Sequence, residues 1–116
     1  MRAVVGWFRR VRHPAAKLLL HVPNECSGRV SRRTLLDRAK DGVVGGVSDL
    51  FLPWPVTGPD GKRYSGLWIE MKVGAGILSD SQKGWLLAMR EAGYAAEVAY
   101  GTDEAIGIIK AYLGLK

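Results

Sequence analysis

Two short apolar runs in the middle of this 116-residue chain carry charged side chains where a hydrophobic core would exclude them. Asp49 directly precedes the run Leu50-Phe51-Leu52, and Glu70 and Lys72 lie inside the run 67–72. Because side chains alternate between the two faces of a strand, Glu70 and Lys72 should lie side by side on one face. If the two runs pair as a hairpin, Asp49 reaches the same place. The sequence therefore predicts a site with two carboxylates and one lysine.

The chemistry of such a site is specific. Two neighbouring carboxylates repel each other and resist joint ionisation, which a divalent cation relieves. Carboxylate oxygens suit Mg²⁺ or Mn²⁺. Such a cation polarises a phosphoryl oxygen and lowers the pKa of a bound water. A lysine beside it can orient or deprotonate that water, or stabilise the charge that develops on the phosphate. These residue types therefore suit hydrolysis of a phosphodiester bond.

The alternative is an ordinary ion pair between Glu70 and Lys72 on a half-exposed strand, with Asp49 as a turn residue. A Glu-x-Lys triplet alone is a weak motif. The catalytic interpretation gains its weight from three accompanying features. These are the Gly-x-x-Asp sequence that ends at Asp49, the basic segment before it, and a serine-capped helix after Lys72.

The elements that must position these residues follow from hydrophobic periodicity and from the turn residues. We expect, in chain order, a helix over 4–12, a strand over 18–22, a basic loop over 24–33, a short helix or turn over 34–40, the two strands joined by a turn-rich link over 53–65, a helix over 79–93, a strand over 94–100 and a last helix from 102. The final strand–helix–strand passage should join parallel strands. The predicted fold class is α/β, with a small mixed sheet flanked by helices.

Helix-capping residues mark two of these boundaries. The sequence Ser79-Asp80-Ser81-Gln82 fits a capping box, with Ser79 as the N-cap and Gln82 at the third helical position. Gly93 is a natural stop for this helix. Thr102 is expected to cap the last helix.

Charge and composition narrow the class of protein. The net charge is +6, yet residues 1–40 hold ten Lys/Arg against two acids, and residues 41–116 carry a net charge of −2. Clustered arginines favour a polyanionic partner, most often nucleic acid, and a merely solubilising surface is the alternative. Cys26 is alone, which favours a reducing, intracellular setting. No apolar run reaches the roughly 20 residues of a membrane span, and the length predicts one domain over residues 1–116.

The motifs together resemble a known family. The segments GGVSDLFLP, YSGLWIEMKVGAGILSDSQKGWL and AGYAAEVAYGTDEAIGIIKAYL are similar to the VRR-NUC domain, the virus-type replication-repair nuclease branch of the PD-(D/E)XK superfamily. The resemblance extends from about Leu18 to Leu113. It implies a restriction-endonuclease-like core and a Mg²⁺- or Mn²⁺-dependent DNA endonuclease.

Domains of this length in the family resemble phage proteins that act on branched DNA, including four-way (Holliday) junctions. The resemblance thus implies a homodimer. It places the protein in the cytoplasm of a phage-infected or prophage-carrying bacterial host. The lack of a membrane-length apolar run predicts no membrane partner. The alternatives are a flap or duplex nuclease of the same chemistry, and a DNA-binding module with little or no catalysis.

The family pattern transfers to individual positions. Its acids fall on Asp49 and Glu70 and its lysine on Lys72, and the resemblance makes the backbone carbonyl of Met71 a further metal ligand. The family glutamine falls on Gln82, where it would orient water or contact the DNA backbone near the scissile phosphate. The alternative role for this glutamine is structural, as the capping partner of the preceding serine.

Two features outside this core pattern complete the expectation. The DNA-binding candidates are one asparagine and six basic residues: Asn24, Arg29, Arg32, Arg33, Arg38, Lys40 and Lys83. Arginine and lysine would contact phosphates without reading sequence. Family members also commonly carry a glutamate on the first helix, which here would lie before Met1. Either the start of the chain has been trimmed or this member uses two acids.

Overall fold

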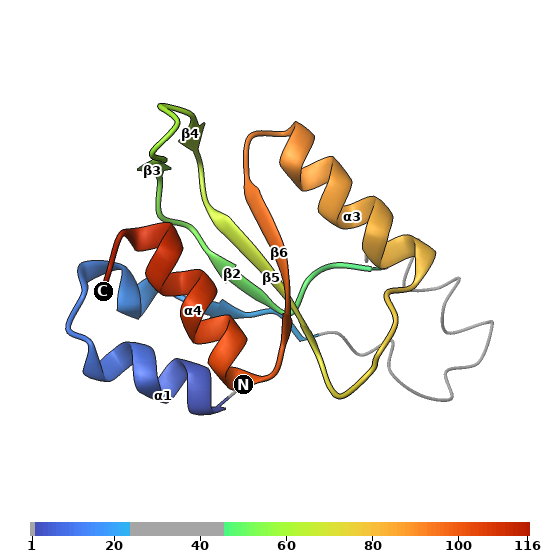
Figure 1. Cartoon of the computed structure of the whole chain (residues 1–116), viewed down its shortest axis with the longest axis horizontal. Coiled ribbons are helices and arrows are strands. Elements are labelled where there is room, and N and C mark those ends of the chain that lie inside the picture. Colours follow the sequence, from blue (N-terminus) through green and yellow to red (C-terminus); the bar gives the residue numbers. More distant parts are fainter. Residues whose placement is uncertain (1, 24–45) are drawn as a thin grey trace.

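The computed structural model describes residues 2–23 and 46–116 (Figure 1). Its elements in chain order are α1 (Arg2–Arg10), the 3-10 helix η1 (Pro14–Leu18), β1 (Leu20–His21), β2 (Leu50–Leu52), β3 (Val56–Thr57), β4 (Arg63–Tyr64), β5 (Leu67–Lys72), α3 (Asp80–Glu91), β6 (Ala95–Tyr100) and α4 (Thr102–Leu113). No helix in the described ranges is long and apolar enough to cross a membrane.

Four of the strands form one mixed sheet in the order β1-β2-β5-β6. The pairs β1–β2 and β2–β5 are antiparallel, and β5 and β6 are parallel. Helices α1 and α4 cover one face of the sheet, and α3 lies on the other (Figure 1). The predicted α/β class, with a small mixed sheet between helices, is confirmed.

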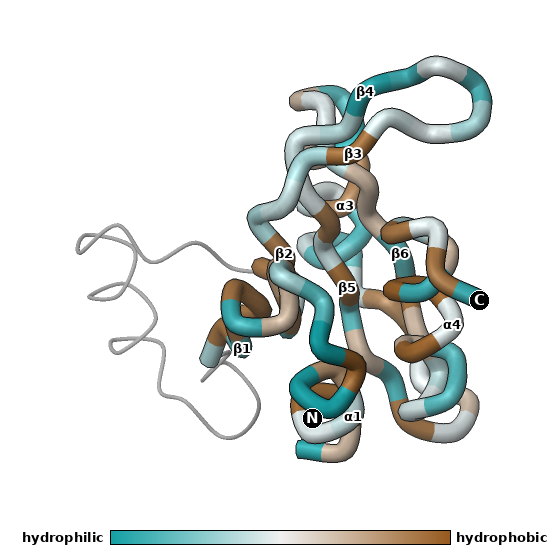
Figure 2. The backbone as a smooth tube through the Cα atoms, turned by 90° about the vertical axis from the view of Figure 1, so that its left-hand side faces the viewer, coloured by the Kyte–Doolittle hydropathy of each residue, from teal (hydrophilic) through white to brown (hydrophobic). Residues whose placement is uncertain are grey.

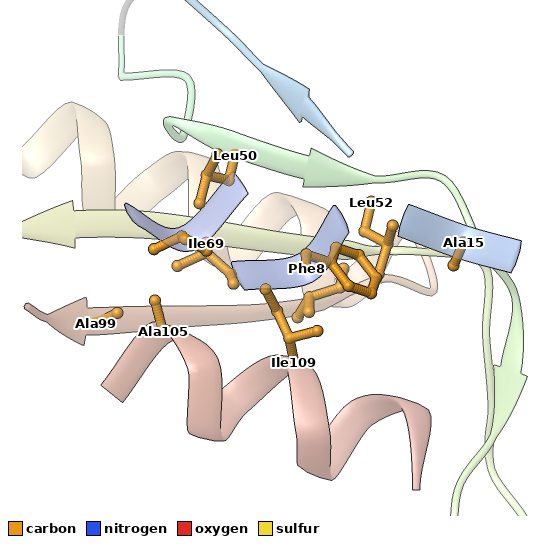
Figure 3. Packing of buried hydrophobic residues seen from close by; sticks show 10 residues of the cluster. Phe8, Ala15, Leu50, Leu52, Ile69, Ala99, Ala105 and Ile109 are labelled. Carbon is orange, nitrogen blue, oxygen red and sulfur yellow. The ribbon is translucent and has the colours of Figure 1, made fainter. Parts of the chain in front are cut away.

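The hydrophobic core lies between the sheet and the α1–α4 pair. Leu50, Leu52 and Ile69 point from the strands toward Phe8 and Ile109 of these helices (Figure 3), and all five are at most 1% exposed. Burial of each such side chain contributes roughly 1.5–3 kcal/mol. Because strand side chains alternate, the residues between them in sequence face α3 instead. The core thus fixes which residues of β2 and β5 are presented on the α3 side.

The link between β2 and β5 forms a small structure of its own. Strands β3 and β4 pair with each other in the register Val56↔Tyr64, and Figure 2 shows this ribbon projecting at one end of the molecule. The hydroxyl of Tyr112 in α4 donates a hydrogen bond of 2.7 Å to the carbonyl of Trp54, which anchors the base of the ribbon. Burial raises the pKa of Tyr112 to about 12.

Two expected boundaries differ from the structure, and further expected elements cannot be compared with it. The strand expected over 18–22 is only Leu20–His21, because Pro14 begins a 3-10 helix that continues to Leu18. Thr102 was expected to cap α4, and this is wrong. Gly101 is the N-cap, with a φ of 99° and no side-chain cap bond, so Thr102 is already helical. The elements expected over 24–40 lie outside the described residues.

Candidate active site

Asp49 lies where β5 extends beyond its partner strand. Strand β2 begins at Leu50, which pairs with Ile69, so Met71 has no partner residue in β2. The Asp49 carboxylate takes that place, because its Oδ2 accepts a hydrogen bond of 2.8 Å from the Met71 backbone N–H. This bond fixes a carboxylate beside the strand that carries Glu70 and Lys72.

A chain of side-chain hydrogen bonds connects β5 to the start of α3. Gln82 donates from Nε2 to Glu70 Oε1 over 2.8 Å, and its Oε1 accepts from Lys72 Nζ over 2.8 Å. The Lys72 ammonium lies 3.8 Å from the same Glu70 oxygen. Gln82 therefore holds the acid and the lysine in one fixed arrangement.

The position of Gln82 is itself fixed by the cap of α3. Ser79 Oγ accepts from the Gln82 backbone N–H, and Gln82 Oε1 accepts from the Ser79 backbone N–H, which together make a capping box. The amide oxygen of Gln82 thus serves the cap and Lys72 at once. The structural alternative, a capping-box partner of Ser79, is confirmed. Contact of Gln82 with water or with the DNA backbone stays a prediction.

Glu70 is a buried carboxyl group. The residue is 2% exposed, and burial is the largest cause that raises its pKa to about 7, followed by the nearby charge of Asp49. Lys72 acts in the opposite direction. The Oε2 oxygen of Glu70 is buried and has no hydrogen-bond partner within the described part of the chain. A buried carboxylate oxygen without a partner is costly, and a cation would remove that cost.

The donor set fits a hard divalent cation. It offers carboxylate oxygens from Asp49 and Glu70, including the unpartnered Oε2. In a strand the N–H and C=O of one residue face the same side, so the Met71 carbonyl faces the side on which Asp49 lies. The described residues contain no group of three or more His, Cys, Asp or Glu that could hold a metal. One or two carboxylates with water is the arrangement that Mg²⁺ commonly takes, and it is a poor site for Zn²⁺.

Comparison with known proteins identifies the family. The family model of the VRR-NUC domain matches residues 4–103. The chain belongs to the VRR-NUC family. A solved structure, a VRR_NUC domain protein, is similar with a TM-score of 0.76 and 28% sequence identity, over 97% of this chain and 83% of that chain. No curated protein matches this chain.

Membership of the VRR-NUC family identifies a nuclease of the PD-(D/E)XK type, which implies DNA as the substrate. Nucleases of this superfamily generally use divalent metal ions. The resemblance inferred from the sequence motifs is therefore confirmed at the level of family and fold.

Most of the residues expected to bind DNA cannot be placed. The DNA-binding candidates Asn24, Arg29, Arg32, Arg33, Arg38 and Lys40 all lie outside the described residues. Lys83 is described and lies exposed on the first turn of α3. Within α1, the residues Arg2–Arg10 include no acid, and Val4 and Phe8 point into the core.

An aromatic cluster that the sequence analysis did not single out supports α3 against the sheet. The rings of Phe51 and Trp68 stack with centroids 4.1 Å apart, and Trp68 meets Trp85 of α3 edge-on at 5.3 Å. Trp68 shares a strand face with Glu70, two residues away. The alternation of side chains in β5 was therefore a signal for this cluster.

Gly46 is a second positioning residue that was missed. A Cβ built on Gly46 would lie 2.5 Å from the backbone C and O of Ser81 and 2.9 Å from the Gln82 N, and its φ is +79°. The segment leading to Asp49 can therefore pass against the first turn of α3 only with glycine here. In the sequence, Gly46 stood out only as the first residue of the Gly-x-x-Asp motif that ends at Asp49.

Proposed function

We propose that this VRR-NUC protein is a metal-dependent DNA endonuclease with its active site at Asp49, Glu70, Lys72 and Gln82. The observation that supports this most is the hydrogen-bonded arrangement of Lys72, Gln82 and Glu70 beside the unpartnered Glu70 Oε2. Asp49, Glu70 and the Met71 carbonyl would hold Mg²⁺ or Mn²⁺. When bound, the cation supplies Lewis-acid stabilisation of a phosphoryl oxygen and a water of lowered pKa.

The residues of the chain then have separate roles. The attacking water oxygen forms a bond to phosphorus as the bond to the leaving oxygen breaks, and negative charge grows on the phosphoryl oxygens. Lys72 as an ammonium group would stabilise that charge, whereas as a neutral amine it would take the proton of the water. Gln82 keeps the ammonium of Lys72 aimed from β5 toward Glu70, and Asp49 fixes the end of β5 through the Met71 N–H.

The finer substrate assignment is branched DNA, in particular four-way junctions. Resolution of a junction needs two symmetric cuts, so a two-fold homodimer is the natural assembly. The support for this is the family likeness and the concentration of positive charge in residues 1–40. We take residues 1–116 as one nuclease domain in an intracellular setting, where its DNA substrate would lie.

The deciding experiment is cleavage of an end-labelled four-way junction beside a linear duplex and a flap of the same sequence, with Mg²⁺, Mn²⁺ or EDTA. We expect metal-dependent paired cuts on the junction. Lys72→Ala should lower the rate by at least about 10²-fold, as for loss of one transition-state donor. Lys62→Ala removes an exposed lysine that lies over Tyr64 in the ribbon, and it should cut like wild type.

Each other outcome selects a different function. Equal cleavage of all substrates would support the proposed active site and contradict the preference for junctions. Cleavage of the flap alone would favour the flap nuclease. Binding without cleavage, unchanged by Lys72→Ala, would favour the DNA-binding module, an outcome made credible by the absence of an acid in Arg2–Arg10. Sedimentation of the free protein and of its junction complex tests the homodimer directly.

A further inference from the structure

The segment that joins β5 to α3 exposes large aliphatic side chains directly beside Lys72. It is the yellow loop at the end of β5 in Figure 1. Val73 is 91% exposed and Ile77 is 84% exposed, more than any other large hydrophobic residue in the described ranges. Exposed apolar side chains gathered at a site mark a binding surface.

A hollow of about 460 Å³ lies against this segment, lined by Ala75, Gly76, Ile77, Leu78, Lys83 and Tyr100. Its lining is mostly apolar and includes one aromatic ring and one ammonium group. Lys83 is exposed and makes no ion pair within the part of the chain that the structure describes. Lys83 therefore places a positive charge at the edge of an apolar hollow.

The hollow adjoins the catalytic residues. Tyr100 pairs with Lys72 in the parallel β5–β6 register, so the two side chains leave the sheet side by side on one face. A Cβ on Gly76 would lie 3.4 Å from Lys72 Cδ, so the segment lies against the stem of this lysine. The hollow therefore lies directly beside Lys72.

The chemistry of the lining matches one part of a nucleic acid. A base has two apolar faces that stack on an aromatic ring or on aliphatic groups, and each nucleotide carries a phosphate that a lysine can bind. Within a duplex these faces are covered by neighbouring bases. Only a base that has left the stack can present them to Tyr100 and Ile77.

We propose that this hollow is a subsite for an unstacked base of the nucleotide that flanks the scissile phosphate, with Lys83 on a neighbouring phosphate. The proposal rests on the proposed function and adds a rule of substrate choice. Unstacking a paired base is costly, and it costs least for a base that is already unpaired. The enzyme should therefore favour cuts next to unpaired nucleotides, as at branch points and flaps.

The test compares three DNA substrates that differ only at the nucleotide beside the mapped cut: fully paired, unpaired, and abasic. Unpaired and abasic positions are both flexible, but only the unpaired one offers a base. Wild type should cut the unpaired substrate about tenfold faster than the abasic one, in line with stacking of one base. Tyr100→Ala should abolish this tenfold difference, and Tyr100→Phe should keep it.

Leu87→Ser is the matched control for Ile77→Ser. Leu87 is also exposed, at 56%, but lies two turns into α3 and outside the hollow. We expect Ile77→Ser to reduce the base preference severalfold and Leu87→Ser to leave it unchanged. Equal cutting of unpaired and abasic substrates by wild type would overturn the subsite, even though the nuclease activity itself would stand.

A binding measurement without cleavage tests this proposal independently of the proposed function. In EDTA, where no cleavage is expected, anisotropy should show tighter binding to an oligonucleotide with the base than to its abasic form, and Tyr100→Ala should remove the difference. This result would support the subsite even if no DNA were cut. Equal binding of both forms would overturn the subsite. Conversion of a dimer to a monomer by Ile77→Ser would also overturn it, because the surface would then bind a second copy of the chain.

Discussion

At the scale of single residues, the site is built around a carboxyl group that the fold makes hard to ionise. Glu70 is buried in β5, close to the charge of Asp49, and its pKa rises from 4.5 to about 7. A cation at Glu70 and Asp49 would reverse both effects by stabilising the ionised forms. In the metal-free protein the ionised form of Glu70 is therefore destabilised, an electrostatic strain that metal binding should relieve.

This strain predicts a pH-dependent stability in the absence of divalent metal. Between pH 4.5 and 7 folded Glu70 keeps its proton, whereas the unfolded chain has released it. Unfolding thus releases protons, and the free energy of unfolding falls as the pH rises through this window. Glu70→Gln removes this titration and should be the more stable protein at pH 8, by up to roughly 3 kcal/mol at about 1.36 kcal/mol per pKa unit.

Urea unfolding of both proteins in EDTA at pH 5 and pH 8 measures the effect. Glu97→Gln on β6 is the control, because Glu97 is exposed. The idea fails if wild type and Glu70→Gln keep the same stability difference at both pH values. Added Mg²⁺ should stabilise wild type more than Glu70→Gln, since the variant lacks one of the two carboxylates.

At the scale of elements, local sequence patterns were enough to predict much of the site. Alternation in the run 67–72 predicted that Glu70 and Lys72 share one face, and the serine–glutamine spacing predicted the cap of α3. Both are local properties of the chain. The predicted N-cap at Thr102 was wrong because Gly101, with a positive φ, takes that position. Capping preferences describe the threonine side chain and say nothing about the backbone conformation of the residue before it.

Contacts between distant segments could not be read from the sequence. The Gln82 side chain forms hydrogen bonds with Ser79, Lys72 and Glu70, and these depend on how α3 packs against β5. The hydrogen bond from the Met71 N–H to Asp49 depends on the register in which β2 ends. The close approach of Gly46 to α3 likewise appears only once both segments are folded.

Gly46 gives the prediction for this scale. In Gly46→Ala the new Cβ must displace the first turn of α3, and the positive φ adds strain. We expect a loss of about 1–3 kcal/mol in the free energy of unfolding and at least a tenfold loss of cleavage, because Gln82 would leave its partners. Thermal unfolding and cleavage rates at a temperature where the variant is folded measure the two effects.

Gly84 supplies the control within the same helix. It lies in α3, and a Cβ there meets nothing within 4 Å. Gly84→Ala should stabilise the protein by about 0.5–1 kcal/mol through helix propensity and leave cleavage unchanged. If Gly46→Ala were folded and cut DNA as fast as Gly84→Ala, the positioning role of Gly46 would be disproved.

At the scale of the whole molecule, stability and chemistry occupy opposite faces of one sheet. The core lies on the side of α1 and α4, and Glu70, Lys72 and Gln82 lie on the side of α3. The same two strands serve both faces because their side chains alternate. Substitutions on the α3 side can therefore alter substrate choice without opening the core.

The distribution of charge gives the last prediction. Residues 1–40 hold a net charge of +8, and six of their eight arginines form two groups of three. Arg9, Arg10 and Arg12 lie in or directly after α1, on the face opposite α3. Arg29, Arg32 and Arg33 belong to the segment that we predict to bind DNA phosphates. Replacing each group by serine removes the same charge from different places.

If the second group contacts DNA, its triple serine variant should lose counterion release on binding. Each phosphate contact contributes about 0.9 to the slope of log K against log salt. The slope should therefore become shallower by roughly two to three, whereas the α1 triple variant should keep the wild-type slope. Junction binding in EDTA across a salt series measures both. Equal changes in both variants would mean that the DNA responds only to overall charge, and the assigned contacts would be wrong.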